Sequence, residues 1–234
     1  MVALGIESAQ NTIRASYLDA GKVGAYFDLL PIEAVDAMIG YGGNGTPLNK
    51  LLVQDYPQSA IELTQALIDG TAKGINPRQV ARNMSDAMAG NLNRALVIAR
   101  SEQLRPFRQA SRQQMIESGV VEGYIRRCAL NLHTCEACLA MDGNEYSTDE
   151  LMEVHPCDRC FMQPKIKGLI PIQVETGEQW FSRQSESAQR EILGAGKFDA
   201  WRSGQFEFKQ LASRYVDSEW GPSIRVTPLS ELIQ

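Results

Sequence analysis

The sequence predicts a mainly α-helical protein with one small β-containing module in its middle, an α+β fold overall. Apolar residues recur at helical spacing in the regions on both sides of this module. Between them lie short runs of strand-forming residues and a group of four cysteines. We expect a helical N-terminal body over residues 1–119, a β-rich module over 120–170 and a helical C-terminal region over 171–234.

The bulk composition is that of a globular protein with a real core. The chain has 234 residues, 44% hydrophobic and 22% charged, with a net charge of -5. This acidic balance argues against a general nucleic-acid coat protein. No apolar run is long enough to span a membrane, and the first nine residues lack the features of a secretory signal.

Prolines and glycines mark the elements expected before residue 76. Pro31 precedes a short helix over 32–38, and a glycine-rich loop follows over 40–46. That loop lacks the Gly-Lys-Ser/Thr ending of a phosphate-binding loop, so we interpret it as a connector. Pro47 and Pro57 open two further helical segments.

A long amphipathic helix is expected to begin at Asn76-Pro77, a capping side chain followed by proline at the first helical position. It should run to about Leu104, and Pro106 should then break or kink it. A second helical segment should end at Gly119. Helical spacing is followed by Val80, Met84, Ala87, Met88, Asn91, Ala95 and Ile98.

Short strands are expected inside the central module. Residues 120–128 favour a strand that leads into it, and 144–147 and 159–162 are further candidates. Asp142-Gly143 is a hairpin-turn signal. A linker marked by Pro164, Gly168 and Pro171 should end the module.

The C-terminal region is expected to be helical. Thr176 and Gln179 have the spacing of a capping box. An apolar helix face should follow it and end at Gly194. This face consists of Trp180, Phe181, Gln184, Ala188 and Ile192, and further buried anchors are Phe198, Trp201, Phe206, Phe208 and Leu211.

The four grouped cysteines predict a structural zinc site. They form the pattern Cys135-x2-Cys138-x18-Cys157-x2-Cys160, and such paired hooks hold zinc tetrahedrally. His155 is an alternative ligand in a three-cysteine, one-histidine site, or a hydrogen-bond partner of a ligand. Two disulfides or free buried thiols are the other interpretations. Cys128 stands apart.

No catalytic group stands out. The two histidines, His133 and His155, both lie beside the cysteines, which is a poor setting for one reactive thiol. A Pro-Cys-x-x-Cys run is present, but the His-x-Glu of zinc deaminases does not precede it. A nuclease in the C-terminal region, using Arg190 or Arg202, is the weakest hypothesis because that region has no histidine.

The region between residues 94 and 127 is locally basic, with seven arginines against three glutamates. One interpretation is a solvated helix face with internal ion pairs. The other is a contact with nucleic acid or an acidic partner, for which the candidate residues are Arg126, Arg127 and Arg159.

Several segments together resemble phage head morphogenesis proteins of the Mu F type. The run Arg94-Ala-Leu-Val-Ile-Ala-Arg100-Ser-Glu102 is similar to that family's Ile-Ala-Arg-Thr-Glu helix. The resemblance continues in order through Gly123 to Arg127, Thr134 to Cys138, Met141 to Gly143, His155 to Cys160, Gly177 to Trp180 and Arg190 to Gly194. The family often has Cys-Arg-Cys at the end of the His155 motif, whereas here Cys157 lies one place earlier.

The resemblance implies a structural minor head protein inside the capsid of a tailed phage. Its expected partners are the portal protein or the inner capsid surface, and packaged DNA is a further candidate. The expected location is the capsid interior near the portal, after assembly in the host cytoplasm. The role implied is assistance in head assembly or DNA delivery. No enzymatic activity is expected, because the sequence has no convincing catalytic constellation.

Overall fold

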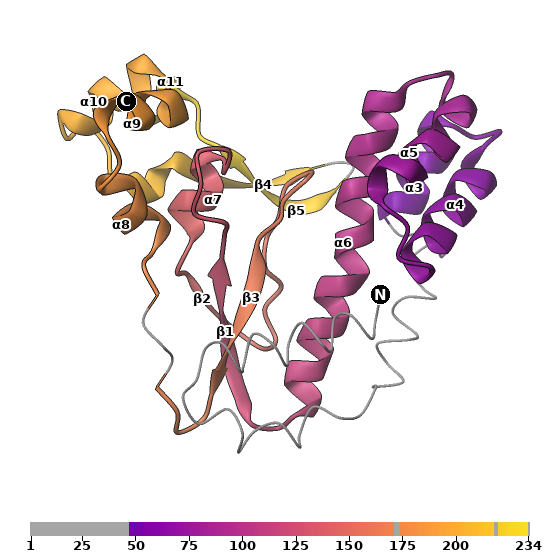
Figure 1. The fold of residues 1–234 in the computed structure, drawn as a ribbon, viewed down its shortest axis with the longest axis horizontal. Helices are drawn as coiled ribbons and strands as arrows, with labels where there is room; N and C mark the ends of the chain where they lie inside the picture. The colour runs from indigo at the N-terminus through magenta and orange to yellow at the C-terminus, as the bar shows by residue number, and fades with distance from the viewer. Residues whose placement is uncertain (1–46, 171–173, 218–219, 234) are drawn as a thin grey trace.

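The computed structural model describes residues 47–170, 174–217 and 220–233. The helix expected over 32–38 and the glycine-rich loop over 40–46 lie outside these ranges. The described part has mixed α and β structure with two small antiparallel sheets (Figure 1). None of its helices combines the length and the hydrophobicity that crossing a bilayer would require.

A helical body precedes the first strand. Its elements are α3 (Pro47–Asp55), α4 (Ala60–Ala72), α5 (Pro77–Ser85), the 3-10 helix η4 (Asp86–Met88) and α6 (Leu92–Glu117). The predicted start at Asn76-Pro77 is confirmed, because the Asn76 side chain accepts a hydrogen bond from the Arg78 amide. In Figure 1, α3, α4 and α5 gather at one end of the long helix α6.

The single helix predicted from residue 77 to about 104 is wrong, because the chain breaks between η4 and α6. Ala89 and Gly90 both adopt positive φ, and the Asn91 side chain then caps α6 by accepting from the Arg94 amide. Of the break or kink predicted at Pro106, the break is wrong, because α6 continues through this residue. Pro106 removes one backbone donor, yet it lies inside α6, which has buried residues on both sides of it.

The central sheet has the strand order β2-β1-β3 and is antiparallel throughout. Its strands are β1 (Val121–Arg127), β2 (Glu145–Ser147) and β3 (Phe161–Ile166), which confirms strands in all three predicted places. Tyr124 lies opposite both Tyr146 and Pro164, so Pro164 belongs to a strand and not to a linker. Helix α6 contacts β3 at the edge of this sheet.

Helix α7 (Glu136–Met141) lies between β1 and β2 and carries two of the cysteines. The hairpin turn predicted at Asp142-Gly143 is therefore wrong. These residues connect a helix to a strand, and Asp142 caps the end of α7. Gly143 still supplies the positive φ that its sequence suggested.

The C-terminal region is not only helical. Its elements are α8 (Gly177–Ser182), α9 (Glu186–Leu193), α10 (Ala195–Arg202), the 3-10 helix η5 (Phe208–Leu211), β4 (Ala212–Asp217), β5 (Gly221–Val226) and α11 (Leu229–Leu232). The capping box of Thr176 and Gln179 is confirmed. The predicted helix over 180–192 is instead two helices, since Ser185 caps a new one. The antiparallel pair β4–β5 was not predicted.

Within the described ranges, the buried hydrophobic residues form two clusters. One belongs to the helical body and includes Leu52, Leu63, Met84 and Ile98. The other joins the central sheet and α7 to the C-terminal elements, so residues from 120–170 and from 171–234 share it. The cysteines lie at the edge of this second cluster, which includes Cys138 and Cys160.

Candidate metal centre

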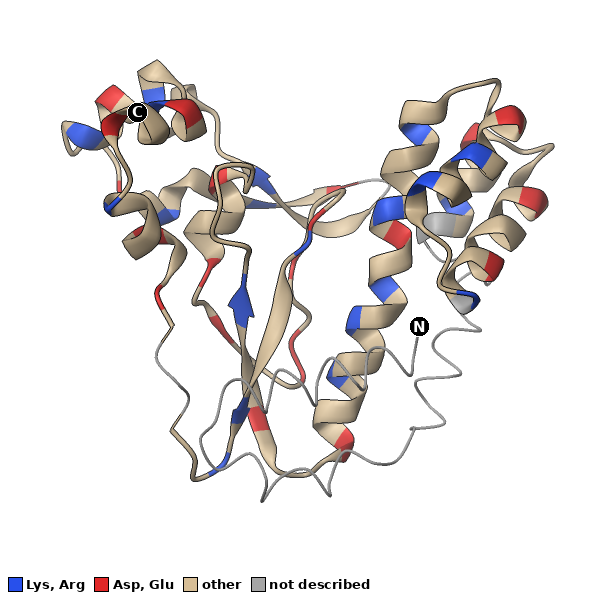
Figure 2. Cartoon of the chain, in the orientation of Figure 1, with Lys and Arg blue, Asp and Glu red and all other residues tan. Residues whose placement is uncertain are grey.

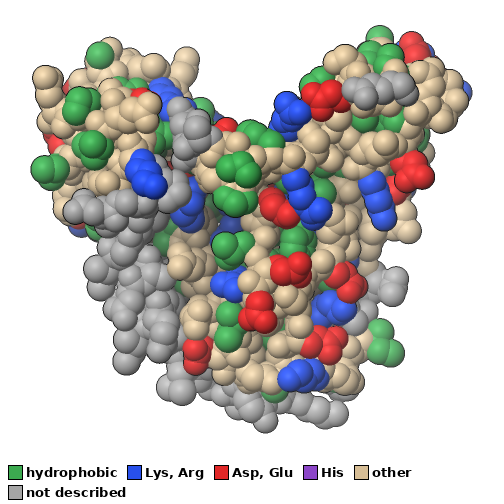
Figure 3. Space-filling view, turned by 180° about the vertical axis from the view of Figure 1, so that it is seen from behind, with side chains coloured by type: hydrophobic (Ala, Val, Ile, Leu, Met, Phe, Trp, Pro, Cys, Tyr) green, Lys and Arg blue, Asp and Glu red, His purple; other side chains and the backbone are tan. Residues whose placement is uncertain are grey.

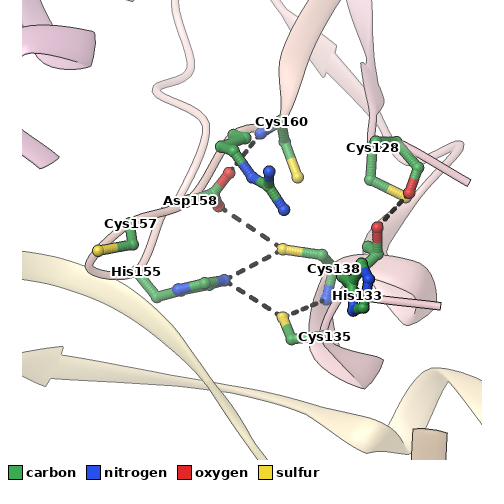
Figure 4. A pocket seen from close by; sticks show the side chains of 11 residues that line it. Cys128, His133, Cys135, Cys138, His155, Cys157, Asp158 and Cys160 are labelled. Carbon is green, nitrogen blue, oxygen red and sulfur yellow. Dashed lines mark hydrogen bonds between the residues drawn. The ribbon is translucent and has the colours of Figure 1, made fainter. Parts of the chain in front are cut away.

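Helix α7 and the loop before β3 bring the site together (Figure 4). Cys135 caps α7 and Cys138 lies in its first turn, where the Cys138 amide donates to the Cys135 sulfur at 3.4 Å. His155 lies in the loop before β3, and Cys160 directly precedes that strand. All five cysteines of the chain are free thiols, so the structure contains no disulfide among them.

His155 points directly at two sulfurs. Its Nε2 lies 3.3 Å from Cys135 Sγ and 3.1 Å from Cys138 Sγ. Its Nδ1 lies 2.8 Å from the Pro156 carbonyl oxygen, which can only accept a hydrogen bond. Nδ1 therefore carries a proton, and Nε2 is the nitrogen that faces the sulfurs and would bind a metal once its own proton is displaced.

Cys138 is shared by two groups of ligand atoms. Cys135, Cys138 and His155 form the first group, and Cys138, Asp158 and Cys160 form the second, with the atoms of each group within 4.8 Å of one another. Soft sulfur donors with one imidazole are the donor set of a tetrahedral zinc site. The donors present are thus able to hold a metal ion.

The structure does not bring Cys157 into either group. Figure 4 shows its sulfur pointing away from Cys135 and Cys138. Cys157 has a positive φ of 65°, and its amide donates to the Ser101 hydroxyl at 2.9 Å, which fixes this orientation. It lines a small cavity of about 90 Å³ beside the site, together with the other candidate ligands. Of the ligands considered from the sequence, His155 takes the place beside Cys135 and Cys138.

Asp158 is held by two arginines. Its carboxylate accepts from Arg126 at 2.6 Å and from Arg108 at 3.2 Å, and it also accepts from the Cys160 amide at 2.6 Å. Burial raises the pKa of this carboxyl, but Arg126 and Arg108 outweigh that effect and lower it overall. Because both of its oxygens are bound, Asp158 positions Arg126 and does not need to serve as a ligand.

Arg126 places a positive charge against the sulfurs. One terminal nitrogen lies 3.3 Å from Cys160 Sγ and 3.7 Å from Cys138 Sγ, and the other donates to the Glu153 carbonyl. Burial lowers the pKa of Arg126, but nearby Cys160, Asp158 and Cys138 raise it overall. A fixed guanidinium here stabilises thiolates, the form in which cysteine binds metal.

The ionisation of the cluster favours a thiolate at Cys135 and a charged imidazole at His155, so a metal would displace the Nε2 proton on binding. The hydrogen bond from Cys138 and, after it, the contact with His155 lower the pKa of Cys135 to about 4 against the opposing effect of burial. Burial lowers the pKa of His155, but the Cys135 contacts outweigh it and raise the value to about 9. Burial and Asp142 raise the pKa of Cys128, which therefore stays a neutral thiol outside the cluster.

Two of the three residues considered for nucleic-acid contact are buried. Arg126 is 0% exposed, and Arg127 is 8% exposed and bonded to Gln163 and Asp142. Their guanidinium groups balance internal carboxylates and are not available to an outside phosphate. Arg159 is exposed and stays a candidate.

Sequence reasoning missed Asp158 and Arg108 as parts of the site. Arg108 reaches from α6 to Asp158 and to the Cys160 carbonyl at 3.1 Å, across about fifty residues of sequence. No local motif signals this contact. The one available signal was the position of Asp158, between the last two cysteines of the pattern.

The fold and the cluster together define a protein of mixed α and β structure with a group of cysteine and histidine side chains that is able to hold a metal ion. Residues 62–163, which include every candidate ligand, match the family model described as Phage Mu protein F like protein. The resemblance to this phage head morphogenesis family is thereby confirmed over that region. The C-terminal motifs at 177–180 and 190–194 lie outside it. No curated protein and no solved structure matches the chain significantly.

Proposed function

We propose that the protein is a structural minor head protein of a tailed phage. In this proposal it sits inside the capsid near the portal and assists head assembly or DNA delivery. The observation that supports it most is the family match over residues 62–163. The matched region holds both the long helix α6 and the candidate metal centre, which the Arg108 contacts join.

We further propose that zinc is bound by Cys135, Cys138, His155 and Cys160, with a structural role. A shell filled by four protein ligands has no position for substrate or water. The metal would tie α7 to the loop before β3, and so fix the second core cluster. This ligand set is favoured over the four-cysteine set because His155 Nε2 lies within 3.3 Å of two sulfurs while Cys157 points away.

The alternative of a nucleic-acid-binding module has less support. Basic residues recur along α6, as Figure 2 shows, but several of them are bound internally: Arg108 contacts Asp158, and Arg105 contacts Glu102. On the face shown in Figure 3, basic and acidic side chains are interspersed. The nuclease alternative also lacks support, because Arg190 and Arg202 pair with Glu186 and lie over the Phe198 ring.

Co-expression with the portal protein of the same phage tests the proposal. We expect the tagged protein to retain the portal through purification, and mass spectrometry of purified heads to detect it in few copies. A major coat protein from the same phage serves as the control bait. Two results together would contradict the proposal. Wild-type heads would not contain the protein, and phage lacking its gene would assemble heads, package DNA and infect normally.

A further inference from the structure

A second site lies on the other side of the loop over residues 155–160, which we call the metal loop. A groove of about 710 Å³ runs between the turn before α5, the middle of α6 and the loop that carries His155 and Cys160. Its lining includes Ile75, Pro77, Arg100, Leu104, His133 and Arg159. The groove therefore lies where the helical body meets the metal module.

Hydrogen bonds to α6 fix both walls of the groove. The Gln103 side chain on α6 donates to the Ile75 carbonyl at 3.0 Å, which fixes the wall formed by the turn before α5. The Cys157 amide donates to Ser101 on α6, which fixes the opposite wall. A preformed groove lowers the cost of ordering on binding.

Two arginines in the groove have no counter-charge. Arg100 and Arg159 are exposed, and within the described ranges neither side chain has an ion pair or hydrogen bond. By contrast, Arg105 and Arg108 on the same helix are paired with carboxylates. The described lining contains no aspartate or glutamate. In a protein of net charge -5, this is a local positive site.

We propose that this groove binds an acidic, extended segment of a partner protein. Guanidinium groups bind carboxylates with two parallel hydrogen bonds, so Arg100 and Arg159 would each take one acidic side chain. Ile75, Pro77 and Leu104 would contact apolar side chains between them. The first turn of α5 lines the same groove, and its partial positive charge also favours an anion.

The lining fits a peptide better than a nucleic acid. Grooves that bind single strands stack bases on aromatic side chains, and none of the described lining residues is phenylalanine, tyrosine or tryptophan. Two arginines also neutralise few phosphates, while the net charge of -5 repels a long polyanion. The site does not depend on the proposed role in the phage head.

Fluorescence anisotropy of the purified full-length protein at low salt tests this proposal. The probes are a labelled peptide of alternating glutamate and leucine, the matching glutamine–leucine peptide and a single-stranded oligothymidine. The double variant Arg100→Glu with Arg159→Glu reverses the charge of the groove, and we call this change groove reversal. The pair Arg82→Glu with Lys209→Glu makes the same charge change at exposed positions outside the described lining.

We expect the glutamate–leucine peptide to bind and the glutamine–leucine peptide to bind at least about tenfold more weakly. Reversal of the groove should weaken binding by a similar factor, and the control pair should bind like the wild type. Circular dichroism checks that both variants fold. Equal binding by both variant pairs, or no binding of the acidic peptide, overturns the proposal. Tighter binding of oligothymidine, lost on groove reversal, overturns it in favour of nucleic acid.

Discussion

Arg126 and Asp158 form an ion pair that lies 0% exposed at the base of the metal centre. The sequence places Arg126 in a basic segment, where a solvated position is the ordinary expectation. Burial is tolerated here because Asp158, the Glu153 carbonyl and two sulfurs surround the guanidinium. Removal of one partner of such a pair leaves a buried charge without compensation.

Asp158→Asn should therefore destabilise the metal-loaded protein by about 3–5 kcal/mol. The matched control is Glu145→Gln, which breaks the Lys165–Glu145 ion pair. This pair has the same N–O distance of 2.6 Å, but the Glu145 side chain is 60% exposed. That change should cost less than about 1 kcal/mol. Urea unfolding measures both. Similar costs for the two variants would show that burial does not set the strength of the Asp158 pair.

The two candidate ligand sets differ at one position, which is Cys157 in the four-cysteine set and His155 in the other. The motif predicted both sets, and only the backbone conformation at Cys157 favours one of them. Positive φ at a cysteine has no sequence signal, because such residues are chiefly glycine or asparagine. The sequence could thus predict that Cys135, Cys138 and His155 lie together and that Cys160 lies near Cys138, but not that Cys157 would turn away.

His155→Ala should weaken zinc binding by more than about a hundredfold. Loss of a residue that only hydrogen-bonds to a ligand already lowers metal affinity by up to about that factor. Cys157→Ser should leave zinc affinity within about threefold of the wild type, because its sulfur does not face the site. Competition with a zinc-chelating dye measures both affinities. The reverse order of effects would establish the four-cysteine set.

At the scale of elements, helix ends were predicted better than helix lengths. Asn76, Gly119 and the Thr176–Gln179 box act through local hydrogen bonds or local φ, which the sequence carries directly. The break after η4 was missed because apolar spacing continues across it. The signal was present, since Gly90-Asn91 pairs a residue suited to positive φ with a capping side chain.

The β4–β5 pair was missed for a different reason. Each strand is short and half exposed, and the two lie beside α7, which is far away in the sequence. Strand formation there depends on these distant contacts more than on local preference. The two core clusters depend on distant contacts in the same way, so sequence could not predict that the central and C-terminal regions share one.

Helices α7 and α8 pack so closely that only glycine fits at one position. A Cβ at Gly177 would lie 2.2 Å from the Leu139 carbonyl oxygen, a backbone atom with little room to move. Gly177→Ala should destabilise the protein by about 1–3 kcal/mol. Gly196→Ala in α10 is the control, since its Cβ meets only the flexible end of Leu229 at 3.0 Å. Thermal unfolding should show a clear loss for Gly177→Ala alone.

At the scale of the whole molecule, α6 links the two core clusters. Ala95 and Ile98 near its start belong to the first cluster, and Met115 near its end belongs to the second. Between them Arg108 contacts the metal loop. Figure 1 shows α6 running from the α3–α5 group along the central sheet. A bound metal would therefore act on the second cluster directly and on the first chiefly through α6, although Trp220 also packs against the first cluster.

Removal of the metal should loosen the molecule unevenly. With a strong chelator, amide hydrogen exchange should rise in β1, α7 and β3, while α4 and the first half of α6 keep their protection. Hydrogen exchange with mass spectrometry, with and without added zinc, makes the comparison. An equal rise across both clusters, or no change in either, would disagree with a metal that stabilises the second cluster.

The central claim is that the cysteine and histidine cluster binds one zinc ion. Native mass spectrometry of the full chain, purified without metal-affinity resin from zinc-supplemented cells, tests it most directly. We predict a mass that corresponds to one zinc ion per chain, which persists through buffer exchange and disappears in a variant lacking both Cys138 and Cys160. A chain that stays folded and carries no metal under these conditions would contradict the account.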